Sequence, residues 1–260
     1  MTNDFFTPKQ QEFLERATHR WNIKEGATRS GKTYLDYYVI PRRIRRLRDK
    51  AGLVVLLGNT KGTLQRNIIT PLQGIWGAGL VSDIKSDNTA VLFGERCYCL
   101  GADKVSQVDV LRGCSIKYAY GDEVVTWAKD VFEMLKSRMD KPYSCFDGTC
   151  NPDAPSHWFK EFLDNPGGLD LYRQNYRLED NPFLDPSVAE NLRREYAGSV
   201  FFDRYILGKW ALAEGLIYQS FGAKNRYRGE IPHRRQEESV RFISCDYGTV
   251  NPSSFGLWGE

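Results

Sequence analysis

Apolar and polar residues alternate along the chain in short blocks that predict strands followed by helices. Residues 7–20 carry apolar positions at helical spacing, residues 21–25 form a strand candidate, and a helix is expected from 32 towards 40, with a kink or break near Pro41. Residues 53–57 are continuously apolar, which is typical of a strand buried on both faces. Residues 90–93 and 96–100 flank Gly94 and predict a hairpin.

The second half of the chain keeps this alternation. It predicts strands at 116–120 and 144–149, an extended segment at 169–178, and helices at about 128–139, 156–163, 187–196 and 200–210. Strands that alternate with helices indicate a mostly parallel α/β sheet. A polar stretch follows, and a new strand at 241–245 then begins, with a hairpin partner at 254–258. We therefore predict an α/β domain over 1–212, a linker over 213–240 and the start of a second domain over 241–260.

The composition is that of an ordinary globular protein and leaves the function open. Charged residues make up 27% of the 260 residues and the hydrophobic class 41%, and the net charge of +3 is too small to indicate a nucleic-acid partner by itself. The longest apolar run is far shorter than the ~20 residues of a membrane span, and the first residues carry no secretion signal. The six cysteines show no metal-binding spacing, so we expect reduced cysteines in a cytosolic protein.

One loop between a predicted strand and a predicted helix matches the pattern GxxxxGK[ST] at every fixed position. This phosphate loop comprises Gly26, Ala27, Thr28, Arg29, Ser30, Gly31, Lys32 and Thr33. Its glycines allow backbone N–H groups to converge on phosphate oxygens, while Lys32 would neutralise the β- and γ-phosphates and the Thr33 hydroxyl would bind Mg²⁺. A chance basic turn is the alternative, but the strand–loop–helix context favours nucleotide binding. Arg29 is either a surface charge or a cation that reaches the γ-phosphate in the transition state.

An acidic pair follows the strand predicted at 116–120. Asp122 and Glu123 stand at its carboxyl end, where α/β sheets place their ligands. Asp122 is expected to hold the Mg²⁺ shell, and Glu123 to polarise water as a general base. The alternative is an acidic turn that starts a helix, since carboxylates favour helix N-termini. Two carboxylates after a phosphate loop indicate hydrolysis of the nucleotide rather than storage.

Taken in order, the motifs of the chain resemble those of the large terminase subunit, the DNA-packaging motor of tailed bacteriophages and prophages. Residues 6–10 (FTPKQ) look like its adenine-recognition motif, and the phosphate loop resembles its arginine-containing counterpart. Residues 111–113 (LRG) resemble a basic motif that supplies an arginine finger, and 148–152 (GTCNP) resemble the coupling motif. Residues 208–210 with 214–218 resemble the exit from the ATPase domain, and 244–248 (SCDYG) are similar to the first strand of an RNase H-like nuclease.

The resemblance implies a role for five further residues, and each has a simpler alternative. Gln10 would read the adenine edge, or is an exposed helix residue. Arg112 would be an arginine finger supplied by a neighbouring subunit, or a partner in an ion pair. Thr149 and Asn151 would couple the γ-phosphate state to motion, or are turn residues before a proline. Asp246 would be the first metal ligand of the nuclease, or an ordinary aspartate at a strand end.

Nuclease activity is not expected from the sequence as given. A two-metal nuclease needs several carboxylates around its pair of ions, and Asp246 is the one acid placed to serve. An endonuclease therefore requires a longer chain.

Six cations within residues 42–50 form the strongest local concentration of charge. They are Arg42, Arg43, Arg45, Arg46, Arg48 and Lys50. Such a run is either a solvated helix face or a surface that contacts DNA phosphates, and the sequence does not decide between the two.

The sequence as a whole predicts a P-loop NTPase fold, with a central, mostly parallel sheet flanked by helices, followed by the first strands of an RNase H-like domain. The expected activity is Mg²⁺-dependent ATP hydrolysis in the cytoplasm of the bacterial host. The resemblance implies that hydrolysis moves double-stranded DNA into a procapsid, with a portal protein and a small terminase subunit as partners and a homo-oligomeric ring as the assembly. The alternatives are a helicase-like or recombination ATPase and a nucleotide-gated scaffold subunit with little turnover.

Overall fold

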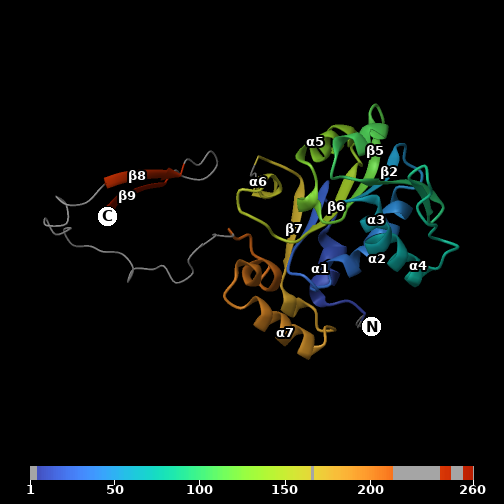
Figure 1. Cartoon of the computed structure of the whole chain (residues 1–260). Coiled ribbons are helices and arrows are strands. Elements are labelled where there is room, and N and C mark those ends of the chain that lie inside the picture. The colour runs from blue at the N-terminus through green and yellow to red at the C-terminus, as the bar shows by residue number, and fades with distance from the viewer. Residues whose placement is uncertain (1–4, 165–166, 213–240, 247–253, 260) are drawn as a thin grey trace. The chain divides into compact units, whose positions relative to one another are not determined.

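The computed structural model describes residues 5–164, 167–212, 241–246 and 254–259 (Figure 1). The chain divides into two compact units, Met1–Glu214 and Gly215–Glu260. In the second unit, the strands β8 (Arg241–Asp246) and β9 (Ser254–Gly259) pair antiparallel, as the hairpin pattern predicts. The predicted linker over 213–240 lies outside the described residues.

The first unit is built on a seven-stranded sheet with the order β3-β4-β2-β5-β6-β1-β7. Its strands are β1 (Trp21–Gly26), β2 (Leu53–Gly58), β3 (Thr89–Leu92), β4 (Glu95–Gly101), β5 (Ile116–Gly121), β6 (Cys145–Cys150) and β7 (Leu171–Tyr176). All neighbouring pairs are parallel except the edge hairpin β3–β4. The mostly parallel α/β sheet predicted from the alternation is therefore confirmed.

Helices cover both faces of this sheet. They are α1 (Pro8–Arg16), α2 (Lys32–Arg46), α3 (Lys61–Leu64), α4 (Thr70–Trp76), α5 (Lys129–Arg138), α6 (Trp158–Asp164) and α7 (Pro186–Tyr196). The 3₁₀ turns are η2 (Val105–Leu111), η3 (Val124–Thr126) and η4 (Leu178–Asp180), and the π-helical turns are η1 (Gln65–Ile69) and η5 (Phe202–Ile206). No helix in the described part of the chain is both long and apolar enough to cross a bilayer.

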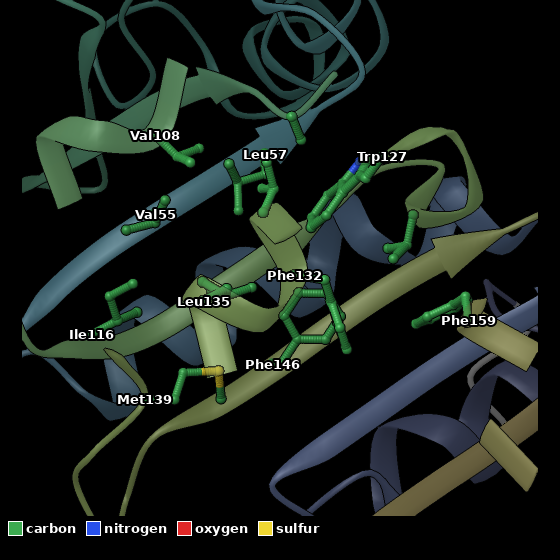
Figure 2. Packing of buried hydrophobic residues seen from close by; sticks show 14 of the residues in the cluster. Val55, Leu57, Val108, Ile116, Trp127, Phe132, Leu135, Met139, Phe146 and Phe159 are labelled. Carbon is green, nitrogen blue, oxygen red and sulfur yellow. The ribbon is translucent and has the colours of Figure 1, made fainter. Parts of the chain in front are cut away.

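The apolar strand β2 has one row of side chains in each of two cores. Val55 and Leu57 pack with Phe132 and Leu135 of α5 on one face of the sheet (Figure 2). Val54 and Leu56 pack on the other face, in a second core that includes residues of α2, α3 and α4. The alternation of side chains along a strand explains why a strand between two helical layers reads as an unbroken apolar run.

Of the kink or break predicted near Pro41, the break does not occur, because the helix α2 continues to Arg46. Proline cannot donate to the carbonyl four residues before it, which here belongs to Tyr37. The indole N–H of Trp76 donates to that carbonyl instead, at 2.8 Å. A side chain from α4 therefore replaces the missing bond, and the helix can pass through the proline.

Two further helical segments differ from the prediction. The segment formed by α3, η1 and α4 is not predicted, because Gly62, Pro71 and Gly74 obscure its helical pattern. The helix predicted at 200–210 is shorter than expected: helical residues begin at 200 and end with the π turn η5 at Ile206. Its surroundings include two glycines with positive φ, Gly198 and Gly208, which end regular structure on either side.

Candidate active site

The phosphate loop joins β1 to α2 and curls tightly against β7. Gly26 has φ +133°, and a Cβ at this position would lie 2.0 Å from the carbonyl oxygen of Tyr176. The Ala27 N–H donates to the same oxygen at 2.8 Å. Gly31 has φ +85° and precedes the first turn of α2, whose free N–H groups favour an anion. The loop therefore has the conformation that its glycines predict.

The side chain of Lys32 is buried inside this loop. Its Nζ donates to the carbonyls of Gly26 and Ala27 at 3.0 and 2.6 Å, and to Oδ1 of Asn151 at 3.0 Å. Burial lowers the pKa of Lys32 below its usual value, and the nearby carboxylates of Glu123 and Asp122 oppose that shift. The ammonium group is thus positioned by protein oxygens at the centre of the loop.

Asp122 follows β5 directly, and its buried carboxylate receives one hydrogen bond on each oxygen. The Nδ2 of Asn67 donates to Oδ2 at 3.2 Å, and the hydroxyl of Thr149 donates to Oδ1 at 3.4 Å. Burial, followed by the charge of Glu123, raises the pKa of Asp122 to about 7, although these two bonds oppose the shift. Such a carboxylate gains from a cation that offsets the cost of its charge.

Glu123 adopts a left-handed conformation, with φ +51°. This geometry is unfavourable for a residue with a Cβ and is typical of functional sites. Asn151 holds the carboxylate at both oxygens: its backbone N–H donates to Oε2 at 3.3 Å and its Nδ2 donates to Oε1 at 3.1 Å. Because the Oδ1 of Asn151 accepts from Lys32, the side-chain amide of Asn151 connects Lys32 of the phosphate loop to the carboxylate of Glu123.

Two adjoining cavities lie along the phosphate loop. The first measures about 470 Å³, and its lining includes Arg29, Lys32, Thr33, Glu123 and Asn151. The second measures about 380 Å³ and is largely apolar. The lining of the second cavity consists of Phe5, Gln10, Gly31, Tyr34, Asn181 and Phe183. The two cavities share several residues, so together they form one continuous site with a charged part and an aromatic part.

Gln10 lines the aromatic part and also joins α1 to the phosphate loop. Its Oε1 accepts from the backbone N–H of Thr7 at 3.0 Å, and its Nε2 donates to the carbonyl of Gly31 at 3.2 Å. Gln10 is buried rather than exposed, so the alternative of an exposed helix residue is wrong. Within the described part of the chain, these bonds leave one amide hydrogen and one lone pair of Gln10 for a ligand. The reading of adenine stays a prediction.

The segment after β7 packs directly on the phosphate loop. The backbone N–H of Thr28 donates to the carbonyl of Tyr205 at 3.1 Å, and Nδ2 of Asn181 donates to the carbonyl of Arg29 at 2.7 Å. An ion pair of 2.6 Å between Arg204 and Asp153 ties the same segment to the chain after Asn151. Sequence reasoning missed these contacts because their partners are far apart in the chain.

The two candidate arginines lie in different places. Arg29 is exposed on the phosphate loop and lines the charged cavity. Arg112 is exposed and pairs with Asp109 at 2.8 Å, and it comes three residues before Ser115, whose carbonyl accepts from the first residue of β2. It therefore lies towards the amino ends of the strands, whereas the phosphate loop follows their carboxyl ends. Within one chain, Arg29 and not Arg112 is brought to the site.

Asp246 is the last residue of β8, in the second unit, and its side chain lies outside the described part of the structure. Asn67 is a residue of the site that sequence reasoning missed. It stands in the π turn η1, and no motif marks it.

The basic run at 42–50 is not uniformly exposed. Arg43 is buried and makes two bonds to Asp147, with Nε–Oδ2 at 2.7 Å and Nη2–Oδ1 at 3.0 Å. Neither of the two predicted roles, a solvated helix face or a contact to DNA phosphates, therefore applies to Arg43. The other five cations of the run are exposed.

Comparison with known proteins identifies the family. Residues 23–223 match the family described as terminase large subunit, T4likevirus-type, N-terminal. The large terminase of a thermophilic bacteriophage is 32% identical, with a TM-score of 0.71, and the match covers 98% of this chain and 65% of that one. The same thermophilic-phage protein in complex with ATP-γ-S gives a TM-score of 0.68 at 32% identity, over 98% of this chain and 64% of that one.

A more distant structure agrees in fold. The large terminase ATPase domain of Thermus phage P74-26 is 13% identical, with a TM-score of 0.58, over 78% of this chain and 92% of that domain. No curated protein sequence gives a significant match. The chain spans 65% of the length of the thermophilic-phage protein. From these matches, the chain belongs to the family of bacteriophage large terminase subunits, of which it carries the N-terminal, ATPase-type region.

Proposed function

We propose that the chain binds ATP with Mg²⁺ on the phosphate loop and hydrolyses it. The observation that carries the proposal is the single amide of Asn151, which bonds both the phosphate-loop Lys32 and the carboxylate of Glu123. This contact puts a candidate water-activating group beside a phosphate-binding group in one cavity. The thermophilic-phage relative, which binds ATP-γ-S, supports ATP as the nucleotide.

The residues would divide the work by position. The loop N–H groups and Lys32 hold the phosphates, and Glu123 accepts a proton from the attacking water. The aromatic cavity next to the loop, lined in part by Phe5, Tyr34 and Phe183, is suited to the flat face of adenine, and Gln10 to its polar edge. The charge that develops on the γ-phosphate would be neutralised by Arg29 in the same chain or by Arg112 of a neighbouring copy.

The donors fit a magnesium ion. Thr33 would offer a hydroxyl and Asp122 a buried carboxylate, and phosphate oxygens and water would supply the other oxygen ligands that Mg²⁺ prefers. In the described residues there is no group of three or more histidine, cysteine, aspartate or glutamate side chains that could hold a metal by themselves. When bound, Mg²⁺ would neutralise charge on the phosphates.

The coupling of hydrolysis to motion would begin at Thr149 and Asn151. A γ-phosphate that attracts the ammonium group of Lys32 would weaken its bond to Asn151. A change at Asn151 would reach Asp153, which lies two residues further along the chain. Asp153 is tied to Arg204 by the ion pair, and its carbonyl accepts from the N–H of Ala211 at 3.1 Å. The segment that contacts the phosphate loop can therefore respond to the state of the nucleotide.

By membership of the family, the work of hydrolysis would move double-stranded DNA into a procapsid, in a homo-oligomeric ring with a portal protein and a small terminase subunit. The second unit, with Asp246 at the end of β8, would begin an RNase H-like nuclease. A helicase-like ATPase and a scaffold subunit with little turnover are the competing functions. The pair Asp122–Glu123 favours hydrolysis over a scaffold.

Steady-state ATP hydrolysis, with and without duplex DNA, tests the proposal. We expect Glu123→Gln to keep nucleotide binding and to lose about 10²–10⁴-fold in rate. Lys32→Ala should lose binding as well. Because a finger supplied by a neighbouring copy requires assembly, the rate is measured over a range of protein concentrations. A wild-type rate no higher than that of Glu123→Gln at every concentration would contradict hydrolysis and favour the scaffold.

A further inference from the structure

The carboxylate of Asp122 is held by donors from two different elements. β5 lies between β2 and β6, and a donor approaches Asp122 from each of these neighbours. Thr149 belongs to β6 and bonds Oδ1, while Asn67 belongs to the helical segment after β2 and bonds Oδ2. The resemblance to terminases assigns a role to Thr149, whereas Asn67 has none. The two bonds together restrict rotation of the carboxylate.

Asn67 reaches the carboxylate because of an irregular turn. Residues 65–69 form the π turn η1 between the α-helical turns α3 and α4. A π turn contains an extra residue, which shifts the side chains after it around the helix, and such turns are frequent at functional sites. It opens the helix at the position where a side chain faces the end of β5.

The phosphate-loop helix fixes Asn67 in this position. The hydroxyl of Tyr37 donates to the carbonyl of Asn67 at 2.9 Å. Tyr37 lies four residues after Thr33 on α2, so the two side chains share one face of that helix. The carbonyl of Tyr37 accepts in turn from Trp76 at the end of α4, so Tyr37 contacts the segment both within η1 and after it.

We propose that Asn67 is a positioning residue for the metal site: its amide sets the orientation of the Asp122 carboxylate relative to Thr33, and Tyr37 holds the amide in place. The proposal rests on the proposed function, because it concerns the Mg²⁺ that accompanies the nucleotide. Residues that hold a metal ligand through a hydrogen bond typically change metal affinity about 10–100-fold when they are removed. The same face of α2 thereby carries Thr33, which would be one metal ligand, and Tyr37, which supports the second ligand Asp122 through Asn67.

The test measures binding, so it does not depend on turnover. The affinity of the full 260-residue chain for fluorescent ADP is titrated in EDTA and at increasing Mg²⁺. For Asn67→Ala we expect a Mg²⁺ requirement about tenfold higher than in the wild type, with the affinity in EDTA unchanged. Tyr37→Phe removes only the hydroxyl, and we expect the Mg²⁺ requirement to rise about threefold.

Two matched variants control the experiment. Thr70→Ala alters an exposed residue of the same helical segment. Tyr143→Phe removes a hydroxyl that, like that of Tyr37, donates to a backbone carbonyl, here that of Ala51 before β2 and away from the phosphate loop. Both should show the wild-type Mg²⁺ curve. If Asn67→Ala does not fold, as judged by thermal unfolding, Tyr37→Phe decides the question alone.

Two results would overturn the proposal. One is a wild-type Mg²⁺ requirement in folded Asn67→Ala or, where that variant fails to fold, in Tyr37→Phe. The other is an equal loss of affinity with and without Mg²⁺, which would mean that Asn67 supports the loop as a whole rather than the metal ligand. A wild-type chain that binds no nucleotide would be a failure of the proposed function itself, and the wild-type titration detects it separately.

Discussion

Arg43 should stabilise the fold, whereas its neighbour Arg42 should not. The guanidinium of Arg43 is buried, and the carboxylate of Asp147 that it bonds is 0% exposed. It also donates to the carbonyl of Ala17. Burial tends to lower the pKa of Arg43, but Asp147 outweighs it and holds the pKa above its ordinary value. We therefore expect a large loss of stability when Arg43 is replaced by methionine.

The size of the loss follows from the charge left behind. At an effective dielectric constant of about 20, opposite charges about 4 Å apart attract by about 4 kcal/mol. Removing one partner of a buried pair costs about 3–5 kcal/mol, because the other charge stays buried without it. For a unit of this size, a loss of about 1 kcal/mol corresponds to a shift in Tm of about 2–4 °C, so Arg43→Met should lower Tm by about 6–20 °C.

Urea and thermal unfolding, followed by circular dichroism, measure this difference. Arg42→Met, at the exposed position next to it, should stay within about 0.5 kcal/mol of the wild type. The double variant Arg43→Met/Asp147→Leu should be more stable than Arg43→Met, because it removes the unpaired carboxylate as well. Equal stability of the Arg42 and Arg43 variants, or a double variant less stable than the single one, would refute the reasoning.

Three further predictions concern the site. Because burial lowers the pKa of Lys32 and bound phosphates would raise it again, ATP binding at alkaline pH should be accompanied by uptake of a proton by Lys32. Calorimetry in buffers of different ionisation enthalpy should detect this uptake, and its absence would contradict the placing of Lys32 against the phosphates. Gly208→Ala should weaken nucleotide binding, since the new Cβ would lie 3.0 Å from atoms of the phosphate loop. Gly198 is also at positive φ but has open space around it, so Gly198→Ala should cost only about 1–2 kcal/mol of stability and leave nucleotide binding unchanged. Asp153→Asn removes the ion pair to Arg204, so it should leave nucleotide affinity unchanged but reduce the effect of bound nucleotide on protease cleavage within residues 197–212. An unaltered effect on cleavage would exclude coupling through this ion pair.

The sheet and the phosphate loop could be predicted because their signals are local. An apolar run of strand length, strands that alternate with helices, and eight consecutive loop residues each reflect the geometry of a short stretch of backbone. Asp122 and Glu123 could be predicted for the same reason, as they directly follow a strand. The left-handed φ of Glu123 and the bonds from Asn151 to its carboxylate could not be predicted, because no local pattern marks the first and the second join residues far apart in the chain.

The features that were missed depend on distant partners. Arg43 belongs by sequence to an exposed basic run, and only its contact with Asp147 of β6, 104 residues away in the chain, shows that it is buried. The break expected at Pro41 does not occur because Trp76 supplies the donor that the proline lacks. Asn67 carries no motif, because its role depends on a single π turn. In each case a tertiary contact overrides the local preference of the chain.

The bonds of Lys32 affect the affinity of the loop for any phosphate that it binds. The ammonium group donates to the carbonyls of Gly26 and Ala27 and to the amide oxygen of Asn151. A phosphate oxygen must exchange with these acceptors instead of meeting a free charge, so part of its binding energy is cancelled by the bonds it replaces. When the phosphate leaves, the ammonium group of Lys32 forms its bonds to the same oxygens again, so its buried charge keeps hydrogen-bond partners. The loop thereby binds phosphate less tightly than it would with a free ammonium group, and Lys32 keeps its acceptors whether or not a phosphate is bound.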